Sequence, residues 1–195
     1  LNLFSKRGFS LFNEQPDSEQ LLIRMSLASK LLPESFPSLN HDDLIADSQW
    51  LAPYLDDIKN LEQLKKFNYS EAIKSCFDWQ QQSLLNELLP LRLTVPSGSN
   101  VKVTYQLDSP AKLSVRMQEV YGMTSTPLLA QGKLPLLMEL LSPARRPLQL
   151  TQDLANFWQT SYRDVQKEMK GRYPKHFWPD NPATSQATNK VKSKM

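Results

Sequence analysis

Apolar residues recur at three- and four-residue spacing along the first half of the chain, as on one face of an α-helix. Prolines and asparagines divide this half into short segments, so residues 15–92 are predicted to form a bundle of short helices. Residues 1–14 carry short apolar runs without a partner, which favours the edge of a preceding domain or a linker. The expected helix caps are Asn40, Asn60, Ser70 and Asp78, the last in a capping box with Gln81.

The pattern changes near Leu91 from helical spacing to alternation. Apolar and polar residues alternate on both sides of PSGSN (96–100), which predicts a β-hairpin. The run LPLLMELL (134–141) is apolar except for Glu139, so it fits either a buried strand or a helix. Leu148 and Leu150 then indicate a further strand. Residues 93–180 are therefore predicted to form a small mixed α/β module.

Two helices are expected within this module. Ser109 and Pro110 are typical of a helix start, and Gly122 is placed to end that helix. A long amphipathic C-terminal helix is expected from Thr151 to Gly171, with Leu154, Phe157, Trp158, Tyr162, Val165 and Met169 on its packed face. The predicted fold class is α+β. Residues 181–195 are polar and basic, which predicts a disordered tail.

Composition and charge narrow the class of protein. No run of about 18 apolar residues is present, so no membrane span is expected. The single Cys76 cannot form an internal disulfide, which suits a reducing cytoplasm. Residues 15–92 hold 7 basic and 12 acidic side chains, whereas residues 163–195 hold 8 basic and 3 acidic ones. This asymmetry indicates either an anionic partner for the C-terminal part or a solvated basic tail.

The chain lacks the sequence signals of the common catalytic sites. It has no GxxxxGK[ST] loop for nucleotide phosphates and no DExH or DExD segment for magnesium. The sequence does not favour a zinc site, because it holds only one cysteine and two histidines. No residue is therefore predicted to be catalytic or metal-binding, and whether the chain belongs to an enzyme stays open on these grounds.

Basic and aromatic residues near the C-terminal end suit a nucleic acid, because guanidinium and ammonium groups bind phosphates and aromatic rings stack on bases. Pro143 and Pro147 stiffen a turn with two arginines, which would contact phosphates or would fix the turn by pairing with carboxylates or carbonyls. The aromatic residues beyond Gly171 would either stack on bases or fold back to seal the domain. The candidate nucleic-acid-binding residues are Arg145, Arg146, Arg163, Lys167, Lys170, Arg172, Tyr173, Lys175, His176 and Trp178.

Several blocks of residues 34–182 resemble the C-terminal region of the HrpB family of bacterial DEAH-type ATP-dependent helicases. These blocks are WLAP (50–53), VPSGS (95–99), Tyr105, QEVYG (118–122), LLSPARRP (140–147), TQDLANFW (151–158) and GRYPKHFWPDNP (171–182). The resemblance implies a parent protein with two upstream RecA-like domains that bind ATP and magnesium. The chain departs from that parent by lacking the motor motifs.

Three functions are consistent with these residues. In the first, the chain is an accessory region of an RNA helicase that assists nucleic-acid binding. In the second, the same surface docks a protein partner or the helicase core, with the aromatics as anchors. In the third, the chain is a structural cap of that core.

Overall fold

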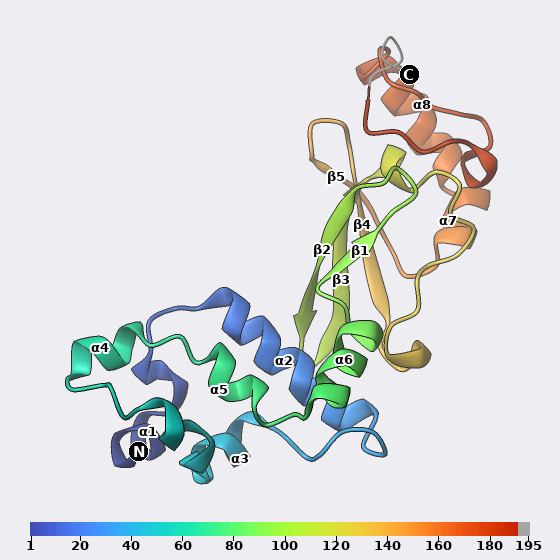
Figure 1. Cartoon of the computed structure of the whole chain (residues 1–195). Helices are drawn as coiled ribbons and strands as arrows, with labels where there is room; N and C mark the ends of the chain where they lie inside the picture. Colours follow the sequence, from blue (N-terminus) through green and yellow to red (C-terminus); the bar gives the residue numbers. More distant parts are fainter. Residues whose placement is uncertain (191–195) are drawn as a thin grey trace. The chain divides into compact units, whose positions relative to one another are not determined.

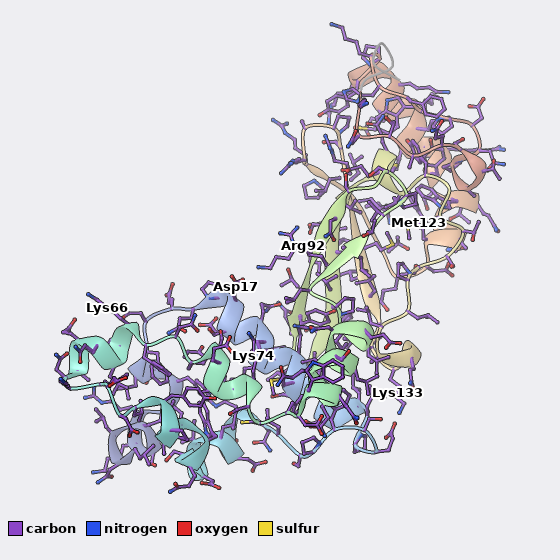
Figure 2. All side chains as sticks on the ribbon, viewed as in Figure 1. Asp17, Lys66, Lys74, Arg92, Met123 and Lys133 are labelled. Carbon is purple, nitrogen blue, oxygen red and sulfur yellow. The ribbon has the colours of Figure 1, made fainter. Side chains whose placement is uncertain are left out.

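The structure is a computed structural model that describes residues 1–190. The fold is α+β, as expected, and divides into two compact units. The helical unit comprises residues 1–89 together with Tyr105–Leu107, and the sheet unit comprises residues 90–104 and the chain from Asp108 onward. Figure 1 shows the first unit built mainly of helices and the second built around the strands. Residues 191–195 of the expected basic tail lie outside the described residues.

The helical unit consists of short helices. Its elements are α1 (Asn2–Arg7), η1 (Gly8–Leu11), α2 (Pro16–Leu31), α3 (His41–Ala46), η2 (Ser48–Tyr54), α4 (Leu61–Lys66), α5 (Ser70–Lys74) and α6 (Trp79–Leu88). Asn40 and Asn60 cap α3 and α4, and Asp78 forms the expected capping box with Gln81. The Ser70 cap is wrong, because Ser70 is the first residue of α5 and makes no cap bond there. No helix within residues 1–190 is long and apolar enough to cross a membrane.

Residues 1–14 belong to the core of the helical unit, which differs from the linker expected for them. Phe4, Leu11 and Phe12 are buried. The Phe4 ring lies 5.7 Å from Trp50, and the Phe12 ring lies 4.9 Å from Tyr69, centroid to centroid. These short apolar runs thus pack against residues about 40 to 60 positions away in the sequence. Local sequence patterns do not reveal such distant contacts.

Arg24 of α2 is a buried cation that holds the C-terminal end of α6. Its Nε donates to the Leu89 carbonyl at 2.6 Å, and its Nη2 donates to Asn86 Oδ1 at 2.8 Å. Terminal carbonyls of a helix lack intrahelical partners and carry a partial negative charge. The guanidinium therefore supplies both the missing donors and the favourable charge. One turn earlier on α2, Gln20 bonds both backbone groups of Tyr105 (3.1 and 2.8 Å).

The sheet contains five strands in sequence order. They are β1 (Arg92–Thr94), β2 (Asn100–Gln106), β3 (Ser109–Arg116), β4 (Leu136–Leu141) and β5 (Pro147–Thr151). The expected hairpin is confirmed, since β1 pairs antiparallel with β2. The run 134–141 is a strand and not a helix: β4 pairs parallel with β3 and antiparallel with β5. Alternate residues of β3 and β4, among them Leu113 and Met138, point into the core.

The helix expected over residues 109–122 is wrong. This segment is strand β3 followed by the 3-10 turn η3 (Met117–Val120). Ala111, Leu113 and Val115 are buried while Ser114 is exposed, so the controlling period is two. The helical spacing from Leu113 to Tyr121 was coincidental, because those residues belong to two different elements.

The long C-terminal helix is divided into α7 (Leu154–Gln159) and α8 (Tyr162–Arg172). The break falls at Thr160 and Ser161. The Thr160 hydroxyl donates to the Asn156 carbonyl at 2.8 Å, and such back-bonding competes with the helical ladder. The expected packed face is nevertheless inward: Leu154, Phe157, Trp158, Tyr162 and Met169 are buried.

Arg24→Met is expected to destabilise the chain by about 1–3 kcal/mol, because the buried Leu89 carbonyl and Asn86 amide oxygen lose their donors. Urea unfolding followed by far-ultraviolet circular dichroism measures this change. The control is Arg7→Met, which removes an exposed arginine from α1 and should alter stability by less than about 0.5 kcal/mol. Equal effects of the two substitutions would show that Arg24 does not hold α6.

Candidate nucleic-acid interface

The turn η3 carries a buried carboxylate that joins two parts of the sheet unit. Glu119 accepts a hydrogen bond from Arg116 Nε at 2.8 Å, and it accepts further bonds from the hydroxyls of Ser97 and Ser99. The Ser97 amide also donates to the Glu119 carbonyl at 3.2 Å. The VPSGS turn between β1 and β2 is thereby fixed against the end of β3.

These contacts decide how Glu119 titrates. Burial alone would raise its pKa, but the hydrogen bonds and charge of Arg116, together with the serine hydroxyls, outweigh burial and hold the pKa below its ordinary value. The carboxylate is therefore charged at neutral pH. It neutralises Arg116, which is consequently a structural cation.

The neighbouring residue of the turn, Gln118, holds the segment that follows α8. Its Nε2 donates to the Phe177 carbonyl at 2.9 Å, and its Oε1 lies 3.0 Å from His176 Nδ1, which must donate because an amide oxygen only accepts. Burial, and then the charge of Arg116, lower the pKa of His176. The imidazole is thus neutral at pH 7, so it positions the chain without adding positive charge.

Residues beyond Asn181 close over the same turn. The Gly122 amide donates to the Pro182 carbonyl at 2.8 Å, and the Thr188 amide donates to the Gln118 carbonyl at 2.9 Å. Pro182 and Thr188 are buried, and Pro182–Thr184 forms the 3-10 turn η5. The disorder expected from composition therefore differs from the structure over residues 182–188, because backbone groups, which composition does not report, make these contacts.

Trp178 is packed in the interior, as the sealing interpretation expects. Its side chain is 4% exposed, and Nε1 donates to the Tyr173 carbonyl at 3.1 Å. Tyr162 and Gln166 of α8 both donate to the Pro179 carbonyl, at 2.8 and 2.5 Å. Trp178 is therefore unavailable for base stacking in this conformation. Tyr173 is half-buried and contacts the His176 ring edge to face.

Two of the exposed basic residues of the C-terminal region are paired with carboxylates. Lys170 Nζ lies 3.2 Å from Asp180, and Arg172 lies 3.7 Å from Glu168. Arg163 interacts with Asp180 electrostatically, and hydrogen bonds from Gln166 and Lys170 contribute most to lowering the Asp180 pKa. A phosphate would have to displace these carboxylates from Lys170 and Arg172, so these two residues are weaker candidates than the sequence suggests.

The turn between β4 and β5 presents two exposed arginines, Arg145 and Arg146. Ser142 holds the turn: its hydroxyl accepts from the Arg146 amide at 3.0 Å, and its carbonyl accepts from the Arg145 amide at 2.8 Å. Neither guanidinium makes a hydrogen bond or an ion pair within residues 1–190. The turn is consequently fixed by backbone and hydroxyl groups, and both arginines are available to a ligand.

Arg145 has φ = 60°, in the left-handed region that side chains with a Cβ adopt reluctantly. An L-residue there costs about 1–2 kcal/mol relative to the right-handed region. A bulky cation is thus held at a position that glycine would fill more easily. Strain of this kind is common where a side chain must be presented to a ligand.

The structure divides the predicted site residues into three groups. Arg145, Arg146, Lys167 and Lys175 are exposed and, within residues 1–190, unpaired. Lys170 and Arg172 form ion pairs with carboxylates, and Arg163 interacts only electrostatically with Asp180. Tyr173, His176 and Trp178 hold the local fold. No pattern in the sequence pointed to Gln118 and Gln166, which are buried and hold this region in place. The three-residue spacing of Arg116 and Glu119 was a weak sequence signal for their ion pair.

Comparison with known proteins identifies the family to which the chain belongs. A family model described as the C-terminal region of the HrpB ATP-dependent helicases matches residues 50–182. The chain belongs to the HrpB helicase family. It is 45% identical over 194 residues to the ATP-dependent RNA helicase HrpB of Escherichia coli K12. It covers 24% of that protein, so the chain spans about a quarter of the length of the relative it matches.

Two solved structures share this fold. The crystal structure of the E. coli DExH-box NTPase HrpB matches 97% of the chain at 44% identity with a TM-score of 0.91. The crystal structure of the E. coli DEAH/RHA helicase HrpB matches 91% of the chain at 43% identity with a TM-score of 0.77. The chain covers 24% and 23% of those two chains, respectively. The resemblance found in the sequence is therefore confirmed, and the chain corresponds to the C-terminal region of an HrpB helicase.

Glu119→Gln is expected to lower the free energy of unfolding at pH 7 by about 1–3 kcal/mol, because Arg116 loses its charged partner. The folded-state pKa of Glu119 is depressed, so its contribution is complete above the unfolded pKa near 4.5 and is lost as pH falls through the folded value. The stability gap between the two proteins should therefore narrow below about pH 4.5. Urea titrations at several pH values test this, with the exposed Glu168→Gln as control; a gap independent of pH would contradict it.

Arg145→Gly is expected to leave the midpoint of thermal unfolding unchanged or to raise it, because glycine adopts the left-handed conformation without a Cβ penalty. Arg146→Gly is expected to lower stability by about 0.5–1 kcal/mol, since no positive φ is relieved there. Calorimetry of the two variants measures the difference in sign. A similar loss in both would mean that Arg145 is not strained.

Proposed function

We propose that this chain is an accessory region that helps an ATP-dependent helicase hold single-stranded RNA. The supporting observation is that Arg145, Arg146, Lys167 and Lys175 are exposed and, within residues 1–190, have no carboxylate partners. Other cations of the sheet unit do form ion pairs with carboxylates, namely Lys112, Arg116, Lys170 and Arg172. Unpaired guanidinium and ammonium groups release counterions from a phosphate backbone at the lowest cost. The relative from E. coli is named an RNA helicase, which supports RNA as the ligand.

In this proposal, ATP hydrolysis takes place in the upstream part of the parent protein. The chain offers neither a phosphate loop nor a DExH segment, so ATP and magnesium would bind outside it. The chain alone should therefore bind RNA without hydrolysing ATP. A cytoplasmic location of the parent, expected from the lone cysteine, also stays a prediction.

Docking of the sheet unit onto the helicase core is the second candidate function. Leu128 is 79% exposed and Leu150 is 53% exposed, so both present apolar surface that a protein partner would cover. These residues favour a protein contact and carry no charge that would attract a phosphate. The two functions are compatible, because the leucines and the unpaired cations are different residues.

The RNA proposal is tested by fluorescence anisotropy of a labelled single-stranded RNA titrated with the 195-residue chain at two salt concentrations. Binding is expected to weaken with salt, with a slope of about −0.7 per phosphate contacted. The variant Arg145→Ala/Arg146→Ala should reduce the magnitude of that slope by about 1.4. Lys167→Ala/Lys175→Ala is expected to act in the same direction.

The matched control is Lys170→Ala/Arg172→Ala, which removes the same number of charges from ion-paired positions. Its effect on the salt slope should be clearly smaller, because these two cations are already paired with carboxylates and are therefore expected to make few phosphate contacts. Absence of binding by the folded chain at low salt would contradict the RNA proposal and favour docking to the helicase core.

A further inference from the structure

The helical unit contains a cavity of about 390 Å³ that the nucleic-acid proposal does not use. A volume of this size suits a side chain or a small ligand. The cavity lies among η1, the start of α2, α3 and Tyr69, all within the helical unit. Its lining residues are Phe9, Ser10, Phe12, Asn13, Glu14, Glu19, Leu22, Ile23, His41 and Tyr69.

Aromatic rings form much of the lining. Phe9 lies 5.2 Å from Tyr69 and 4.7 Å from His41, and Phe12 lies 4.9 Å from Tyr69, between ring centroids. The face of an aromatic ring carries partial negative charge, so it attracts a cation placed over it. This lining is therefore suited to a ligand that is both flat and positively charged.

Two carboxylates add to that preference. Glu14 and Glu19 line the cavity and are exposed, and within residues 1–190 neither side chain has a hydrogen bond or an ion pair. Residues 1–89 hold 8 basic and 13 acidic side chains, so the unit around the cavity is negative as well. An anionic ligand such as a phosphate is disfavoured here.

Tyr69 lines the cavity although most of its side chain is packed. Its hydroxyl has no hydrogen-bond partner within residues 1–190, and no side-chain polar atom of these residues is both buried and unpaired. The hydroxyl therefore reaches solvent, where a ligand in the cavity can contact it. Burial, and then the charge of Glu19, raise the pKa of Tyr69 to about 12, so a carboxylate lies close to this hydroxyl. The phenol therefore stays protonated, and its oxygen retains acceptor capacity for a cationic donor.

We propose that this cavity binds an arginine side chain of a partner polypeptide. The guanidinium would lie against the half-buried ring of Phe9 and would donate hydrogen bonds to Glu14 and Glu19. Arginine fits better than lysine, because its planar group stacks on aromatic rings and donates in several directions at once. The site is separate from the RNA-binding residues of the sheet unit and does not depend on them.

The test is an NMR titration of the ¹⁵N-labelled 195-residue chain with the blocked tripeptide acetyl-Gly-Arg-Gly-amide. Shifts are expected at backbone amides of the cavity lining, and they should weaken with salt. The same peptide with citrulline has the same shape without the charge and should bind about tenfold more weakly. Equal binding of the citrulline peptide, equal binding of the lysine peptide, or shifts confined to other residues would overturn the assignment.

Two variants separate binding from folding. Glu14→Gln/Glu19→Gln should weaken the arginine peptide about tenfold, whereas Asp56→Asn/Asp57→Asn removes two exposed carboxylates of the same unit and should not. Tyr69→Phe should also weaken binding while leaving the thermal midpoint unchanged, because the hydroxyl has no partner to lose. Unchanged affinity in both Tyr69→Phe and the glutamate variant would overturn the proposal.

Discussion

The sheet unit depends on one buried carboxylate, that of Glu119. A charged group taken out of water costs several kcal/mol unless it is paired and hydrogen-bonded, so its position demands that Arg116, Ser97 and Ser99 meet around it. Once they meet, the turn between β1 and β2 is fixed against the end of β3. The preceding residue, Gln118, bonds to the chain after α8 and thereby sets where the C-terminal aromatic residues lie.

Local chemistry explains which parts of this fold were readable in the sequence. The capping box at Asp78 and the alternation on both sides of PSGSN are short-range signals, and both were interpreted correctly. The helix assigned to residues 109–122 failed because apolar residues of a strand and a following turn happened to fall at helical spacing. Sequence spacing does not separate these cases when a strand is short and borders a 3-10 turn. The parallel pairing of β4 with β3 shows that residues 109–116 form a strand.

The candidate site shows a second limit. Basic residues can be recognised in any sequence, but the carboxylates that pair with them cannot. Lys170 pairs with Asp180 because the chain changes direction after α8. Trp178 was a candidate for base stacking, with packing against the domain as the alternative, and burial favours the alternative. The buried amides that hold this segment were not predicted. A residue such as Gln166 shows no pattern of its own, because its three acceptors lie 12 to 14 positions away.

The backbone contacts of residues 182–188 affect where a fragment of such a protein should begin and end. The family match ends at residue 182, yet the Gln118 carbonyl receives its donor from Thr188, and a Cβ at Gly122 would meet the Ser185 carbonyl at 3.2 Å. The match also begins at residue 50, downstream of Arg24 and of the first aromatic residues. A fragment trimmed to those two limits would keep the recognisable motifs and discard the groups that complete both interiors. The limits of the family model and the limits of the packed interiors are therefore different in this chain.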